Sequence, residues 1–473
     1  MNAIIALSLF GISSLFLGFL NNRKILLPAT LIFILIALGL NFADWNHEYL
    51  WFNSMLRTNN LSINFTTVIL ISTLLVVAIS RGFGDDEEHS HPAEYYAILM
   101  FSVVGAIMMV TYENLIMLFV GLEILSVSMY VLTGSDKRNL RSNEAALKYF
   151  LMGSFATGIL LFGVALVYGA TGSFDIHGIG LAVKDTKAQM GGLGLYGPIL
   201  TAGIIMMLAG LLFKISAAPF HFWTPDVYDG APSLFTAFMS TVVKTAGVAA
   251  TYRLLSTAFP DMYGTWGNPM VYITAITLIV GNLTAVYQQS FKRMLAYSSI
   301  SHAGYLLITV LAKRPETNSS ILFYSLAYSI ATISAFAVLI VVSEAKSKAG
   351  KPDESFDALN GLSKNNPFLA FVLAVSMLSL AGIPLTAGFF GKFFIFTDAF
   401  SNPSGIFKSL LVVAVLISAV GIYYYFKPII AAYMRNGDTE KIEISPIYKF
   451  TLILTTILTI LLGIAPDLVK KLF

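Results

Sequence analysis

Four ionisable side chains stand inside long hydrophobic runs of this sequence: Glu123, Lys214, Lys244 and Lys392. A charge at the centre of a membrane-spanning helix costs about 2.5–3.5 kcal/mol, so such groups are expected to face one another or water. Burial favours the neutral forms of a carboxylate and an ammonium, whereas pairing Glu123 with Lys214 favours both charged forms. A group held between these influences changes its protonation when a neighbour moves. The pattern predicts a proton relay, for which lysine is better suited than the permanently charged arginine.

His302, in the segment SSISHAGY, is a fifth candidate, because an imidazole exchanges protons near neutral pH. Each candidate also has a static alternative. Glu123 and Lys214 would form a pair that only locks helix packing, and Lys244 would lie at a tight helix contact. Lys392 would snorkel to an interface, and His302 would be a hydrogen-bonded structural residue. Replacing the lysines separates the two interpretations, since only a relay needs them to titrate.

Two hydrophobic segments are interrupted close to these lysines. Pro219 follows Lys214 by five residues, and we expect it to remove a hydrogen bond from its helix. Pro384 stands in the glycine-rich segment SLAGIPLTAGFFGKFFIF, residues 379–396, which also carries Lys392. A broken helix at membrane depth is tolerated only where protein or water surrounds the freed backbone. Two such breaks at corresponding positions indicate two inverted repeats around an interior pathway.

The composition places the chain in a membrane. Of its 473 residues, 56% are hydrophobic and 12% are charged, against roughly 25% charged in soluble domains. The net charge of +3 comes with no basic stripe, which argues against nucleic acid as a partner. The absence of cysteine excludes a disulfide framework, an iron–sulfur cluster and a thiolate-bound metal within this chain. The glycine-rich segment at 191–197 lacks a strand before it and is predicted to be a loop.

The hydrophobic runs are about as long as a helix needs to cross the bilayer, and they predict an all-α polytopic membrane protein with about fourteen spans. The predicted spans are 3–20, 25–42, 61–80, 95–111, 114–133, 145–169, 195–219, 232–257, 270–288, 294–312, 319–343, 366–400, 405–434 and 446–464.

The basic residues of the short loops predict the orientation, because lysine and arginine favour the cytoplasmic side. With both termini outside, the inner loops carry the longer set: Arg23, Lys24, Arg81, Lys137, Arg138, Arg141, Lys292, Arg293, Lys346, Lys348, Lys351, Lys364, Arg435 and Lys441. The outer set is then Arg57, Lys184, Lys187, Lys313, Arg314, Lys470 and Lys471.

The acidic stretch GDDEEHSH, residues 84–91, is predicted to be a solvated turn. Its histidines, His89 and His91, do not by themselves make a metal site, and no metal is expected in this chain.

The segment KISAAPFHFWTPDVYDGAPSLFTAFMSTVVKTAG, Lys214–Gly247, closely resembles the antiporter-like, proton-translocating membrane subunits of respiratory complex I, NADH-quinone oxidoreductase. KRMLAYSSISHAGY, Lys292–Tyr305, and PLTAGFFGKFFIF, Pro384–Phe396, support the resemblance, which covers nearly the whole chain. Within the family, HFWTPDVYDGAP looks like subunit N, since the L and M subunits and the multisubunit sodium/proton antiporters usually have leucine at the position of Thr224. Lys392 also fits N or L better than M, which usually has glutamate there.

The resemblance implies fourteen helices in a single membrane domain. Residues 1–94 would form the first three helices and a loop. Residues 95–257 and 270–434 would form two inverted five-helix repeats, in which helices 7 and 12 are broken. Residues 446–464 would form the last helix. By motif position Glu123, Lys214, Lys244 and Lys392 correspond to the charged residues of helices 5, 7, 8 and 12, and His302 to the hydrophilic axis that connects them.

The implied function is proton export as a non-redox subunit of an NADH:quinone oxidoreductase in the bacterial inner membrane. The implied partners are the M-, K-, J-, A- and H-type membrane subunits and the peripheral arm, which would hold the flavin and the iron–sulfur clusters, so that no cofactor is expected here. The alternatives are a subunit of an Mrp-like cation/proton antiporter, a membrane subunit of a related hydrogenase, or a scaffold whose charges only pack helices.

Overall fold

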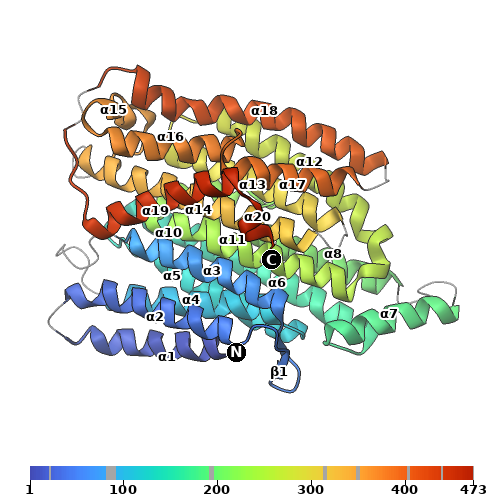
Figure 1. Ribbon diagram of the computed structural model, residues 1–473. Coiled ribbons are helices and arrows are strands. Elements are labelled where there is room, and N and C mark those ends of the chain that lie inside the picture. The colour runs from blue at the N-terminus through green and yellow to red at the C-terminus, as the bar shows by residue number, and fades with distance from the viewer. Residues whose placement is uncertain are drawn as a thin grey trace.

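The structure is a computed structural model that describes residues 1–20, 23–80, 92–190, 197–312, 317–347, 352–401, 405–437 and 440–471, with the side chains of 186–190 excepted. In these ranges the chain is a bundle of helices with one short hairpin. Figure 1 shows the helices side by side, with α1 (Asn2–Leu17) and α2 (Leu26–Ala43) at one edge and α18 (Gly405–Met434) at the opposite edge. The predicted all-α polytopic fold is confirmed.

Some residues discussed above fall outside the described part. These are the side chains of Arg81, His89, His91, Lys187, Lys313, Arg314, Lys348 and Lys351, and residues 191–196 of the glycine-rich segment.

Fourteen crossings agree with the fourteen predicted spans. In the described part of the chain, twelve helical segments are long and apolar enough to cross a membrane, and the shorter apolar helices α1 and α16 bring the set to fourteen. The remaining spans begin with α3 (Asn60–Ala78), α4 (Pro92–Thr111), α5 (Leu115–Thr133), α6 (Leu140–Thr171) and α8 (Gly197–Lys214). They continue with α10 (Ser233–Phe238) leading into α11 (Lys244–Arg253), then α12 (Tyr263–Val286), α13 (Phe291–Ala312), α14 (Thr317–Ala345), α16 (Pro367–Ala381) with α17 (Ala387–Phe400), and α19 (Pro446–Ile464).

The shorter elements lie within, between or after these spans. They are the 3₁₀ turns η1 (Arg23–Ile25), η5 (Pro260–Met262) and η6 (Phe356–Leu359), the π turns η3 (Met239–Val243) and η4 (Leu254–Ala258), and the helices α7 (Ile176–Met190), α9 (Trp223–Gly230), α15 (Leu362–Asn365) and α20 (Asp467–Lys470).

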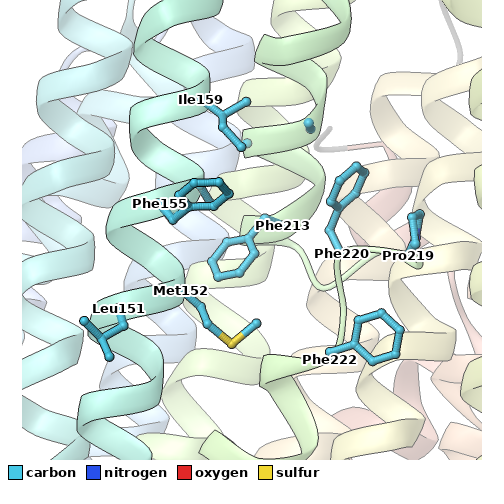
Figure 2. Close-up of a pocket in the computed structure, with 11 residues that line it drawn as sticks. Leu151, Met152, Phe155, Ile159, Phe213, Pro219, Phe220 and Phe222 are labelled. Atoms are coloured by element: carbon cyan, nitrogen blue, oxygen red, sulfur yellow. The ribbon is translucent and has the colours of Figure 1, made fainter.

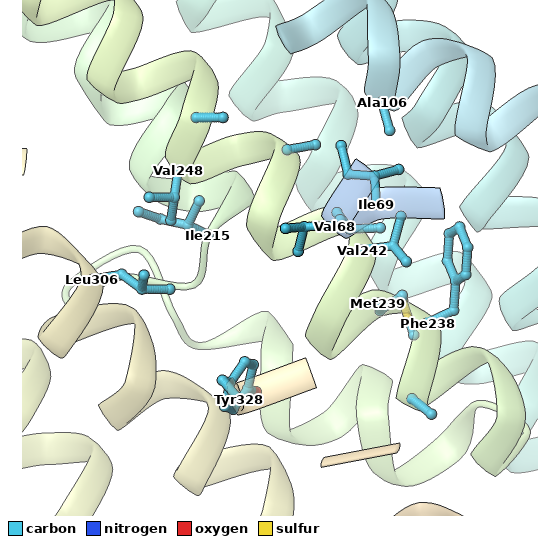
Figure 3. Packing of buried hydrophobic residues seen from close by; sticks show 14 of the residues in the cluster. Val68, Ile69, Ala106, Ile215, Phe238, Met239, Val242, Val248, Leu306 and Tyr328 are labelled. Atoms are coloured by element: carbon cyan, nitrogen blue, oxygen red, sulfur yellow. The ribbon is translucent and has the colours of Figure 1, made fainter. Parts of the chain in front are cut away.

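The core lies around the span that runs through α10 and α11. The most apolar windows of this span and of α14 are entirely buried, and that of α13 is 94% buried, whereas the window of α18 is only 28% buried. Figure 3 shows Val242 and Val248 of the central span packed among Val68 of α3, Ala106 of α4 and Leu306 of α13. A side chain on α11 or α13 is therefore remote from lipid.

Both predicted breaks are present, but the first differs in detail. α8 ends at Lys214, and residues 215–222 form a non-helical connection to α9. Pro219 thus lies within this connection, not inside a continuing helix whose hydrogen bond it would remove. The second break, residues 382–386, contains Pro384 and separates α16 from α17.

Two elements were not predicted. α7 lies between the predicted spans 145–169 and 195–219, and its residues Ile176, Ile179 and Val183 recur at helical spacing and are buried. The strands β1 (Tyr49–Trp51) and β2 (Leu56–Thr58) pair antiparallel between α2 and α3.

The two chain ends lie on the same face of the bundle, because the number of crossings is even. The N-terminal ammonium binds Asp44 at 3.1 Å, beyond the end of α2, and Thr58 at 3.3 Å, in the hairpin. We call this face, which carries both ends, the hairpin and the α4–α5 junction, the terminal face.

Candidate functional site

Lys214 is the last residue of α8, and its ammonium is buried between α5 and α6. Its side chain lies where the helix ends, and the residue is only 4% exposed. Nζ donates to Ser126 Oγ at 2.8 Å and to Tyr149 Oη at 3.3 Å. No carboxylate of the described residues lies within ion-pair distance of Lys214. The ammonium is thus held by neutral hydroxyl oxygens.

Glu123 does not form the direct pair with Lys214 that the sequence favoured. Its Oε1 is buried and has no hydrogen-bond partner among the described residues. Ser126, which accepts from Lys214, follows Glu123 by three positions on α5, so the two share one face of the helix. On that face, Ser126 is the side chain that accepts from the ammonium.

The break after Lys214 is held by neighbouring side chains. The Ala218 N–H donates to Thr277 Oγ1 of α12 at 2.9 Å, and the Trp223 indole donates to the Phe213 carbonyl at 3.1 Å. Backbone groups freed by the break thus find partners within the protein, as membrane depth requires. The break is therefore a stable part of the fold.

An apolar cavity of about 410 Å³ lies on the lipid side of this break. Figure 2 shows Met152 and Phe155 of α6 facing Phe213, with Phe220 and Phe222 of the break closing the other side. Its walls are almost entirely hydrocarbon, and Phe155 and Phe222 are largely exposed. Lys214 does not line this cavity.

Lys244 follows the π turn η3 at the centre of the bundle and is 2% exposed. Its Nζ donates to both the carbonyl and the hydroxyl of Ser299 on α13. Single π turns inside α-helices are frequent at functional sites. One turn further, Gly247 packs so closely on Ile215 that an added Cβ would lie 2.6 Å from Ile215 Cγ2. α11 therefore touches the break that follows Lys214.

His302 lies in a cluster of tyrosines and is 3% exposed. Its Nδ1 shares a hydrogen bond with Tyr324 Oη of α14 at 2.6 Å, and its Nε2 shares one with Tyr425 Oη of α18 at 3.0 Å. The ring of Tyr328 lies 4.5 Å from the imidazole, centre to centre. The imidazole thus has a hydroxyl group at each nitrogen, which is the arrangement that a proton exchanger needs.

Lys392, on α17, is 7% exposed and reaches back across the second break. Its Nζ donates to the Ala381 carbonyl at 2.8 Å and lies 5.0 Å from the ring centre of Tyr305. Gly382, at φ 83°, makes room for this side chain, since a Cβ there would lie 2.8 Å from Lys392 Cδ. Pro384 itself lies exposed in the break.

One face of α13 joins the last three groups. Ser299, His302 and Tyr305 recur every three residues, so they lie along the same side of the helix. The first binds Lys244, the second binds the tyrosines of α14 and α18, and the third lies under Lys392. The structure therefore brings Lys244, His302 and Lys392 into one polar row through the core. Lys214 and Glu123 lie at one end of it, across the contact of Gly247 with Ile215.

The sequence analysis missed the tyrosines of this row and a second buried acid. Glu113, at the junction of α4 and α5, is 2% exposed and pairs with Arg253 of α11. Arg57 of the hairpin and His177 of α7 lie 3.5 and 3.2 Å from the same carboxylate. Glu113 directly precedes Asn114, the N-cap of α5. The sequence signal that could have identified Glu113 is an acidic residue at the end of a hydrophobic run, with basic residues in the flanking loops.

Lys148 makes an i,i+4 pair with Glu144, at 2.8 Å, and also binds Asp226 of α9 at 3.0 Å. Arg293 reaches the same aspartate at 3.1 Å. This network lies at the face opposite the terminal face and ties α6, α9 and α13 together. The described residues hold no group of three or more His, Asp or Glu side chains that would bind a metal.

The fold and the row of buried ionisable groups define a polytopic membrane protein with charges on interrupted helices. The family model described as NADH:quinone oxidoreductase/Mrp antiporter, TM, matches residues 113–418. The chain belongs to this family. NADH-quinone oxidoreductase subunit N of Flavobacterium psychrophilum is 39% identical over the whole of both chains. The same subunit of Cytophaga hutchinsonii is 40% identical over 100% of this chain and 99% of its own.

Solved structures agree with this placement. A chain of respiratory complex I from Thermus thermophilus superposes with a TM-score of 0.82 at 33% identity, covering 99% of this chain and 98% of that one. A chain of the Mrp complex from a Dietzia species superposes with a TM-score of 0.83 at 20% identity, covering 100% and 96%, and shows a shared fold. The resemblance to subunit N of complex I is thus confirmed.

Proposed function

We propose that this chain is a proton-translocating membrane subunit of an NADH-quinone oxidoreductase. It would act in the bacterial inner membrane, without a cofactor of its own, beside M-, K-, J-, A- and H-type membrane subunits and a peripheral arm that carries out the redox chemistry. Full-length similarity to subunit N relatives supports the assignment. The excess of basic residues in one set of loops supports an orientation with both termini on the outer side.

The observation that carries the proposal is the hydrogen bonding of the three buried lysines. Lys214, Lys244 and Lys392 are nearly inaccessible, and each donates only to neutral oxygens of the described residues. An ammonium that served only to pack helices would be expected to have a carboxylate beside it, because an unpaired buried charge is costly. A lysine that alternates between its charged and neutral forms needs hydrogen-bond partners that are compatible with both forms.

The proposed sequence of events begins at Glu123. Quinone reduction in a partner subunit would change the field of Glu123 on Lys214, which would then release its proton towards Lys244. From Lys244 the proton would pass along the row of α13, through His302 and its tyrosines, to Lys392. Hydroxyl and imidazole groups at hydrogen-bond distance can pass a proton by accepting on one side and donating on the other. Lys392 would then export it.

We also propose that residues 95–257 and 270–434 form two inverted repeats, with a three-helix part at 1–94 before them and a last helix at 446–464. Each repeat would contain one broken helix, α8–α9 in the first and α16–α17 in the second, with a lysine at its break. This arrangement is typical of transport proteins in which two halves enclose a central pathway.

The test is proton pumping by the assembled complex carrying Lys214→Ala or Lys244→Ala. We expect assembly to survive and redox-coupled pumping in proteoliposomes to fall strongly. Lys214→Arg should lose pumping as well, because arginine keeps its charge. Lys408→Ala, at an exposed position of α18, is the control and should pump normally. Full pumping by assembled Lys214→Ala and Lys244→Ala variants would contradict the relay.

A subunit of an Mrp-like cation/proton antiporter is the second candidate, since the family model covers both kinds of complex. Purification of the chain from native membranes in mild detergent distinguishes them. Subunits that contain flavin and iron–sulfur clusters should co-purify for an oxidoreductase, and their absence from an intact complex would favour the antiporter.

A further inference from the structure

A second cavity, of about 600 Å³, opens at the end of α18 away from the terminal face. One wall is the last part of α18, and the other is formed by the loop after α12 together with the segment around η6. Phe356 N–H of η6 donates to the Gln289 carbonyl at 3.4 Å, which joins the two parts of that second wall. Both polar and apolar side chains line the cavity, and none of the groups in the proposed relay lies among them.

Lys427 provides an available cation in this cavity. It lies half-buried on α18, and its Nζ donates to the Val286 carbonyl at the C-terminal end of α12. The rings of Tyr423 and Phe356 lie 5.6 and 5.8 Å from Nζ. Among the described residues no carboxylate lies within ion-pair distance of it. An ammonium has three donors, so Lys427 can still bind an anion.

Three further donors border the same space. The side-chain amide of Gln289 and the hydroxyl of Tyr423 make no hydrogen bonds to other described residues. Arg435 lies 3.7 Å from Asp357, and both side chains of this pair are more than half exposed, so the pairing is weak. With two cations and one carboxylate, the cavity carries a net positive charge.

Lys427 lies on α18 near the boundary between the hydrocarbon layer and the lipid headgroups. The 30 residues of α18 span about 45 Å, about 15 Å more than the hydrocarbon layer, so the helix ends reach the headgroup region. Met434, the last helical residue, follows Lys427 by seven positions, which is about 10 Å. The Lys427 side chain can extend from there towards the headgroups.

The apolar side of the cavity continues onto the outer surface of α18. Ile422 and Ile430 line the cavity and are 37% and 39% exposed, and Tyr423 is 62% exposed. A ligand held here would therefore have its anionic part at Lys427 and Arg435, and a hydrocarbon part along the isoleucines.

We propose that this cavity binds an anionic phospholipid, with the phosphate against Lys427, Arg435, Gln289 and Tyr423 and an acyl chain along Ile422 and Ile430. Basic pockets between membrane helices at this depth are suited to such headgroups. A free phosphate would satisfy the donors and leave the apolar wall exposed, so a lipid fits both halves of the cavity.

For the test, the chain is purified with the subunits that accompany it and exchanged into nanodiscs of phosphatidylcholine with a minority of phosphatidylglycerol. Native mass spectrometry then measures which lipid stays bound. We expect a retained phosphatidylglycerol, and about tenfold weaker retention for Lys427→Gln, equivalent to about 1.4 kcal/mol. Lys427→Arg should retain the lipid. Lys408→Gln, at the other end of α18, is the matched control and should retain phosphatidylglycerol as well as the unaltered chain does.

Three results would overturn the proposal. Equal retention by Lys427→Gln and the unaltered chain would place the lipid elsewhere. Displacement of phosphatidylglycerol by inorganic phosphate at comparable concentration would mean that the cavity recognises the anion alone. A photoreactive phenylalanine analogue in place of Tyr423 should give a lipid adduct in native membranes, and a cross-link to a neighbouring protein instead would show that a subunit covers the cavity.

Discussion

Replacement of Gly382 by alanine tests whether the position of Lys392 matters for pumping. Gly382 has φ 83°, and a Cβ there would lie 2.8 Å from Lys392 Cδ. Ordinary carbon contacts are about 3.5–4.0 Å, so the lysine side chain has to move by about 1 Å. Such a movement weakens the 2.8 Å bond from Nζ to the Ala381 carbonyl.

The expected effect on function is larger than the effect on stability. The left-handed conformation costs alanine about 1–2 kcal/mol, whereas the clash is relieved by moving a flexible side chain. A displacement of about 1 Å in a reacting group can slow a reaction about 100-fold. We therefore expect Gly382→Ala to assemble and to pump protons about 10–100-fold more slowly, measured as the rate of redox-driven acidification in proteoliposomes.

Gly172 offers a matched control, because it ends α6 at φ 71° and an added Cβ there would meet no atom within 4 Å. Gly172→Ala should lose a similar amount of stability in a thermal unfolding assay and pump normally. The reasoning fails if Gly382→Ala pumps at the unaltered rate, or if Gly172→Ala loses pumping to the same extent.

Two further substitutions test other parts of the structure. Tyr425→Phe removes the hydroxyl that bonds His302 Nε2, so we expect slower proton pumping and a loss of about 1 kcal/mol in the free energy of unfolding. Unchanged pumping would show that Tyr425 takes no part in proton transfer. Glu113→Gln leaves the guanidinium of Arg253 buried without its counter-ion, and thermal unfolding should show a loss of about 3–5 kcal/mol. Glu48→Gln, in a more exposed pair, should cost less than about 1 kcal/mol, and an equal loss in both variants would contradict this account.

The spans were predictable because length and hydrophobicity alone decide which segments cross a membrane. Lys214, Lys244 and Lys392 were also found from the sequence, since a charge inside such a segment is costly and therefore conspicuous. The direct pairing of Glu123 with Lys214 was not found in the structure. Ser126 lies on the same face of α5 and accepts from the lysine instead, a detail that depends on helix rotation.

The tyrosines around His302 were beyond sequence reasoning for a different reason. Tyrosine is common in membrane helices, so Tyr324 and Tyr425 do not stand out from their surroundings. They meet the imidazole only because α14 and α18 pack around α13, which brings together residues that are 22 and 123 positions apart in the sequence. The π turn before Lys244 is likewise a result of packing in the core and has no local sequence signal.

The three-residue repeat of Ser299, His302 and Tyr305 has a consequence for how this part of the chain can vary. Successive residues of an α-helix are turned by about 100°, so one inserted residue after Ser299 would rotate both His302 and Tyr305 away from their partners. A substitution at one of these positions changes the contacts of that residue alone, whereas an insertion or a deletion changes the contacts of all the residues that follow it. We expect α13 to accept altered side chains between Ser299 and Tyr305 far more readily than any change in its length.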